Sequence, residues 1–206
     1  IRGTDRTAVG TAMSAGEGRQ GSGPTIDTPP PIAYAGLRAL YDYWRSLGHR
    51  AGGLPAIAQF DALHLPRLLP NIWLIEVEPE THRFRMRLAG ENINAIYRRN
   101  IGRKYFAEIF EPRDLQAMVS RYRRALIDPA IFCAKGHVYA AAGHYCVGER
   151  LGLPMLGRDG GTRVLLGATC YGHRTDDHVA LRPAGDEPSF HVVRAANHRA
   201  VEIVGL

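Results

Sequence analysis

Six cysteine and histidine residues lie on or beside the last three strand-like runs of the chain and could, by residue type, bind a metal. They are Cys133, His137, His144, Cys146, Cys170 and His173. Thiolates and imidazoles are the ligands of structural zinc, and a single histidine can ligate haem iron. No C-x-x-C pair occurs among them, and three cysteines, an odd number, cannot all be paired in disulfides. We therefore predict buried thiols and surface imidazoles, without a metal site, and the sequence assigns no cofactor.

Arginine clusters are the second set of residues whose side chains could bind a ligand. The clusters are Arg98-Arg99, Arg103-Lys104, and the group Arg121, Arg123 and Arg124, in a chain of formal net charge +6. Guanidinium groups bind phosphate, so a basic nucleotide- or nucleic-acid-binding adaptor is one candidate function. No aromatic residues are interleaved as base-stacking platforms, which makes solvated surface positions the preferred interpretation. Arg83, Arg85 and Arg87 stand apart, because alternation places all three on one face of a predicted strand.

The sequence lacks the motifs of enzyme chemistry. Five serines occur, but none lies in the G-x-S-x-G pattern of a nucleophile elbow. The string GEGRQG at residues 16–21 matches G-x-G-x-x-G, but no predicted strand precedes it and no helix follows it. We predict that the protein is not an enzyme.

Composition divides the chain of 206 residues into three parts. Residues 1–31 are poor in apolar residues, which predicts a flexible tail. Residues 32–173 carry the apolar patterns of one folded domain, and residues 174–206 form a weakly patterned C-terminal extension. No run reaches the 18 apolar residues of a membrane span, and the cysteine usage fits a reducing compartment. We therefore expect a cytoplasmic protein without a membrane partner.

An amphipathic helix is predicted at the start of the folded domain, over residues 34–47. Its apolar stripe consists of Leu37, Leu40, Tyr41, Trp44 and Leu47. Such a stripe must pack on another surface, which is either the outer face of a sheet or a second subunit. We interpret it as an oligomer or output helix and expect a homodimer.

The remaining elements predict an α+β fold. A hairpin joins strands at 72–77 and 82–88, a longer helix begins at Pro112, and three strand-like runs follow at 131–139, 145–155 and 164–171. Strands that neighbour one another in sequence, with helices grouped between them, imply a five-stranded antiparallel sheet with short helices and one longer helix on one face.

Several strings carry a family resemblance: LRALYDYWRSL from Leu37, RFRMRLAG from Arg83 and VLLGATCYG from Val164. Together with this order of elements they resemble a PAS-like domain family that is found mainly in alphaproteobacteria and was formerly a domain of unknown function. The resemblance covers about residues 34–172. It implies a sensory module that binds a small molecule or a partner protein, and it brings neither an assigned ligand nor a catalytic residue.

A PAS-like arrangement implies a ligand cavity between the sheet and the short helices. Its candidate lining is Phe84, Met86, Leu88, Ile93, Ile96, Tyr97, Phe106, Met118 and Tyr122. A dry core made of the same residues is the preferred interpretation, because any core needs apolar stripes at these spacings.

The function that we predict is a non-catalytic sensory or regulatory domain. It binds a small molecule or a partner signalling protein and signals through its N-terminal helix or a dimer interface. The alternatives are the nucleic-acid adaptor, which is the less favoured partner class, and a purely structural protein–protein adaptor with a filled core.

Overall fold

The computed structural model of the chain describes residues 25–26, 29–47, 53–127, 129–139, 142–143, 146–172 and 189–194. Its helices are α1 (Ala35–Ser46), α2 (Glu91–Ile96), α3 (Phe106–Ile109) and α4 (Pro112–Ile127), with short 3-10 helices η1 (Ile57–Gln59), η2 (Ala62–His64) and η3 (Pro66–Asn71). Its strands are β1 (Thr25–Ile26), β2 (Ile72–Val77), β3 (Phe84–Ala89), β4 (Lys104–Tyr105), β5 (Ala130–His137), β6 (Val147–Leu156), β7 (Arg163–Tyr171) and β8 (Ser189–Arg194). Among the described helices, none has the length and apolar character needed to cross a membrane.

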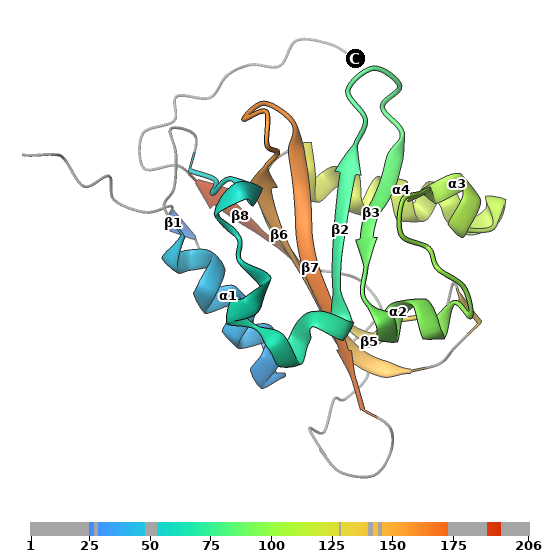
Figure 1. The fold of residues 1–206 in the computed structure, drawn as a ribbon, viewed down its shortest axis with the longest axis horizontal. Helices are drawn as coiled ribbons and strands as arrows, with labels where there is room; N and C mark the ends of the chain where they lie inside the picture. The colour runs from blue at the N-terminus through green and yellow to red at the C-terminus, as the bar shows by residue number, and fades with distance from the viewer. Residues whose placement is uncertain are drawn as a thin grey trace, which may run out of the picture.

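The strands form one antiparallel sheet in the order β1-β8-β5-β6-β7-β2-β3-β4 (Figure 1). The five strands expected from the sequence are its centre, but the expectation of only five strands is wrong. The missed strand β8 pairs along β5, with Phe132 opposite Phe190, so part of the predicted extension belongs to the sheet. At the same edge β1, from the predicted tail, pairs with β8. The other residues of the predicted tail and extension lie largely outside the described residues.

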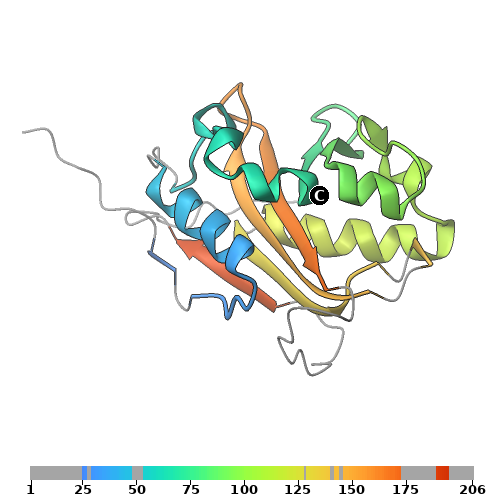
Figure 2. The same ribbon diagram turned by 60° about the horizontal axis from the view of Figure 1, so that its bottom comes forward.

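Helices cover both faces of the sheet: α2, α3 and α4 lie together on one face, and α1 lies on the other (Figures 1 and 2). We call the face under α2, α3 and α4 the inner face, and the face under α1 the outer face. Each face carries its own cluster of buried apolar side chains, and alternating residues of β7 contribute to both clusters. Leu165 packs in the cluster on the inner face, while Leu166 and Ala168 pack in the cluster on the outer face. Strands buried on both sides explain the nearly continuous apolar run in this part of the sequence.

Helix α1 docks on the outer face through the predicted stripe. Leu37, Leu40 and Trp44 are 0% exposed, and Leu47, which caps the helix, packs against the same cluster. The Trp44 indole donates a hydrogen bond from Nε1 to the carbonyl of Pro154, at 3.1 Å. The sequence left two partners open for this stripe, the outer face of a sheet or a second subunit. In the structure the stripe packs on the sheet. A second subunit could contact these side chains only if α1 left the sheet.

A β-bulge in β3 interrupts the alternation predicted for this strand. Leu74 of β2 pairs with Leu88, while the next residue, Ile75, pairs with Met86, so Arg87 is the extra residue. The bulge turns Leu88 to the outer face, where the residue is 47% exposed. The expectation that Leu88 shares the inner face with Phe84 and Met86 is therefore wrong.

The packing of α1 on the outer face also buries the thiol of Cys133, which is 3% exposed. This burial, with a smaller effect of Glu149, raises the pKa of Cys133 from 9.0 to about 12. Above pH 9 the thiol ionises in the unfolded chain but stays protonated in the folded one. The thiol's contribution to stability is therefore complete below pH 9 and is lost as pH rises toward 12.

We expect urea unfolding to show this loss between pH 8 and pH 10. The stability difference between the native protein and Cys133→Ala should narrow over this interval by about 1 kcal/mol. Because other titrating groups act in both proteins, only the difference between the two is diagnostic. Parallel pH curves for the two proteins would contradict the buried-thiol assignment.

Candidate functional site

The space between the inner face and helices α2 to α4, which we call the chamber, is almost filled by side chains. Of the nine residues predicted to line it, Met86, Ile93, Tyr97 and Tyr122 border a remaining cavity of about 20 Å³. Phe84, Ile96, Phe106 and Met118 belong to the surrounding cluster without bordering that cavity. Aromatic rings occupy much of the space: Tyr122 meets Trp73, Phe106 and Phe132 at centroid distances of 5.5–5.8 Å. The cavity as it stands has room for a single water molecule or monatomic ion and for no larger ligand.

A charged residue, Arg150 of β6, borders this cavity. Its Nε donates to Thr169 Oγ1 at 3.0 Å, its Nη1 to the Tyr122 hydroxyl at 3.1 Å and its Nη2 to the carbonyl of Val138 at 2.5 Å. The guanidinium also lies 5.2 Å from the ring centroid of Tyr139. Sequence reasoning missed this residue, although two charged residues, Glu149 and Arg150, interrupt an otherwise apolar strand.

The tyrosines around Arg150 do not supply a negative charge at neutral pH. Burial raises the pKa of Tyr97 well above its usual value of 10.0, and burial likewise raises the pKa of Tyr139. Both phenols therefore stay neutral. Among the described residues, no carboxylate forms an ion pair with Arg150 either.

A second and larger concavity lies on the outer face, over β2 and β3, where α1 does not reach. This groove has a volume of about 750 Å³, and its floor is formed by Leu74, Leu88 and Val164. Its polar rim consists of Glu76, Glu78, Arg85, Arg87, Arg103, Arg158, Asp159 and Thr162. Two rim arginines, Arg85 and Arg87, belong to the row that the sequence placed on one strand face. The sequence missed the groove, because the β3 bulge that brings Leu88 into its floor leaves no local pattern.

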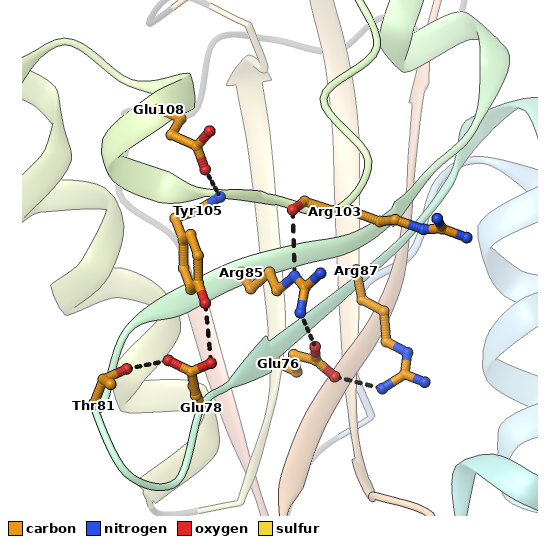
Figure 3. A network of polar contacts seen from close by, with 8 residues as sticks. All are labelled: Glu76, Glu78, Thr81, Arg85, Arg87, Arg103, Tyr105 and Glu108. Atoms are coloured by element: carbon orange, nitrogen blue, oxygen red, sulfur yellow. Dashed lines mark hydrogen bonds and ion pairs between the residues drawn. The ribbon is translucent and has the colours of Figure 1, made fainter.

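One glutamate neutralises much of the charge of this row. Glu76 Oε2 lies 2.7 Å from Arg87 Nη1, and Glu76 Oε1 lies 3.9 Å from Arg85 Nη1 (Figure 3). Arg85 also donates from Nε to the carbonyl of Arg103 at 3.3 Å. The third member of the row, Arg83, stacks instead on the Tyr105 ring, 3.7 Å from its centroid.

The other two acidic residues of the groove, Glu78 and Asp159, each accept a hydrogen bond from a threonine of the turn in which they lie. Glu78 accepts hydrogen bonds from Thr81 and from the Tyr105 hydroxyl, and these bonds lower its pKa (Figure 3). Asp159 accepts from the hydroxyl and the backbone N–H of Thr162, which lower its pKa.

Arg103 and Arg158 complete the groove. Both are exposed, and neither has a carboxylate partner among the described residues. The side chain of Arg103 points away from both groove glutamates (Figure 3). The groove thus combines an apolar floor with two uncompensated cations.

The remaining basic and metal-ligating candidates do not converge on a site. Arg99 caps α3 by donating to the carbonyl of Glu108 at 2.8 Å, and Arg123 and Arg124 are exposed on α4. The described part of the chain contains no group of three or more metal-ligating side chains. Cys133 and Cys170 pack in the outer cluster and Cys146 against the inner one, while His144 and His173 lie outside the described residues.

Comparison with known proteins identifies the family but gives no closer relative. Among curated proteins and among solved structures, no significant match was found. The sequence profile described as "PAS domain" matches residues 33–170, which is well over half of the chain. The matched segment begins just before α1 and ends in β7, so it spans the central five strands and the four α-helices of the described residues. The chain therefore belongs to the PAS domain family.

Proposed function

We propose that this PAS domain is a non-catalytic regulatory module that acts by binding an acidic segment of a partner protein in the groove on the outer face. The observation that carries this proposal is the contrast between the two concavities. The chamber is filled down to about 20 Å³, whereas the groove offers about 750 Å³. Membership of a family of sensory and regulatory domains supports the same role.

The chemistry of the groove supports a protein segment rather than a small molecule. Small-molecule sites bury about 70–90% of their ligand, but here the Arg87 side chain is 52% exposed and Leu88 is 47% exposed. An extended segment suits so open a surface, since it gains further contacts beyond the groove. One apolar side chain of the partner segment would cover Leu88, and carboxylates of the same segment would pair with Arg103 and Arg158.

The groove is also placed to communicate with α1, which we propose as the output helix. Ile57 of η1 lines the groove. Next to η1, Phe60 packs on the ring of Tyr43 at a centroid distance of 5.6 Å. The Tyr43 hydroxyl accepts a hydrogen bond from the backbone N–H of Asp61 at 3.0 Å. A partner that displaced η1 would therefore act on α1.

Site-specific photo-crosslinking in the native cell tests the proposal. With the photoreactive residue at position 88, we expect a discrete protein adduct, and with it at the exposed position 123 of α4 we expect none. Arg103→Gln and Arg158→Gln should each lower the adduct yield about 5- to 10-fold, as loss of roughly 1 kcal/mol predicts. Arg123→Gln, with the same change in net charge, should leave the yield unchanged.

Other outcomes would overturn the proposal. An adduct of twice the chain mass would identify a second copy of the chain, and a nucleic-acid adduct would favour the basic adaptor. A discrete extra mass per chain in the native mass spectrum, without any adduct, would favour a small-molecule sensor. Equal adducts from positions 88 and 123 would indicate non-specific contact.

A further inference from the structure

The chamber contains a cationic group, Arg150, that has N–H groups without an acceptor and no acidic partner for its charge among the described residues. Arg150 has five N–H groups, of which the bonds to Thr169, Tyr122 and Val138 use three. All three acceptors are neutral oxygens, and the only acid beside it in sequence, Glu149, faces the other side of the sheet. A charge in the protein interior is costly unless it is paired.

A second observation at the same cavity points to a missing partner. The Tyr139 hydroxyl is buried in a residue that is 3% exposed, and it makes no hydrogen bond of normal geometry to a described residue, although the nearby Thr169 side chain partly offsets the effect of burial on its pKa. Tyr139 and Arg150 both line the cavity of about 20 Å³. An unpaired buried hydroxyl is rare, and a species placed between it and the guanidinium would satisfy both.

We infer that the chamber binds one small inorganic anion, of the size of chloride or bromide, between Arg150 and Tyr139. The cavity volume excludes larger acids, and the donors that face it are a guanidinium and a phenol, which both suit an anion. This site is separate from the proposed partner groove and lies on the opposite face of the sheet. Glu149, the neighbour of Arg150 in β6, accepts hydrogen bonds from the backbone N–H groups of Ala33 and Tyr34 before α1, so an anion at Arg150 would stabilise the strand that holds α1.

Thermal unfolding in chloride and in gluconate at constant ionic strength tests the inference, because gluconate is too large for the cavity. At about ten times its Kd, chloride should raise the Tm of the native protein by about 3 °C relative to gluconate. Arg150→Met should abolish this difference, and Arg123→Met should retain it. Tyr139→Phe, which removes only the phenolic hydroxyl, should fold normally and at least halve the chloride effect. Bromide-soaked crystals should show an anomalous peak beside Arg150.

Three results would overturn the inference. One is an equal chloride response in the native protein and Arg150→Met. Another is a Tyr139→Phe protein that is more stable in both salts with an unchanged chloride response, since the hydroxyl would then be merely unpaired. The third is bromide density elsewhere but none beside Arg150. A failure of the groove experiments would leave each of these measurements unaffected.

Discussion

Trp44→Ala is expected to lower the free energy of unfolding by about 3–5 kcal/mol, the range for deleting a fully buried tryptophan side chain. Trp44 is 0% exposed between α1 and the sheet, and its indole also satisfies the carbonyl of Pro154. Removing the side chain would leave a cavity at the centre of the outer cluster and a buried carbonyl without its donor. Both effects act in the same direction.

Urea unfolding followed by far-UV circular dichroism measures this loss, because the signal does not depend on tryptophan fluorescence. Asp42→Ala, on the exposed side of the same helix, is the matched control and should change stability by less than about 0.5 kcal/mol. A loss below about 1 kcal/mol in Trp44→Ala would show that α1 packs loosely, contrary to the structure.

This expectation changes how the output helix can be tested. A double change of Leu40 and Trp44 to glutamate would place two charges in a fully buried cluster and unfold the outer face. Loss of a dimer in that variant would therefore say nothing about a subunit contact. Exposed positions on α1, such as Asp42, are the appropriate places to probe a partner of this helix.

The sequence predicted the elements with strong local patterns. Strand β2 has the predicted bounds, Ile72–Val77, and α4 begins at the predicted Pro112, because alternation and a proline in the first turn are local signals. The β3 bulge has no such signal, since it arises from pairing with β2, and so Leu88 was placed on the wrong face. Strand β8 was missed because its apolar patch is short and its partner β5 lies more than fifty residues earlier.

The candidate sites were harder to predict than the fold. Arg150, Tyr139 and Tyr122 come from β6, from the residues after β5 and from α4, and only the folded sheet brings them together. The charged pair Glu149-Arg150 inside an apolar strand was the one available signal. A buried pair of opposite charges next to each other in a strand must face opposite sides of the sheet, so each needs its own partners.

Glu149→Ala is the second change expected to have a large effect, about 3–5 kcal/mol, the range for breaking a buried ionic contact. Glu149 is 1% exposed, and its Oε2 accepts hydrogen bonds from the backbone N–H groups of Ala33 at 2.9 Å and Tyr34 at 3.0 Å. Its Oε1 lies 3.2 Å from Lys135 Nζ. Alanine would leave both N–H groups and the ammonium without this acceptor, at the point where the chain enters α1.

Two variants separate the contribution of the charge from that of the hydrogen bonds. Glu149→Gln keeps an acceptor oxygen and should lose about 1–2 kcal/mol, while Glu80→Ala, in the exposed turn of the β2–β3 hairpin, should lose less than about 0.5 kcal/mol. Hydrogen exchange gives the local readout, because the amides of Ala33 and Tyr34 should lose protection in Glu149→Ala before the sheet does. If those amides stayed protected, another acceptor would hold the start of α1, and Glu149 would not link the helix to the strand that carries Arg150.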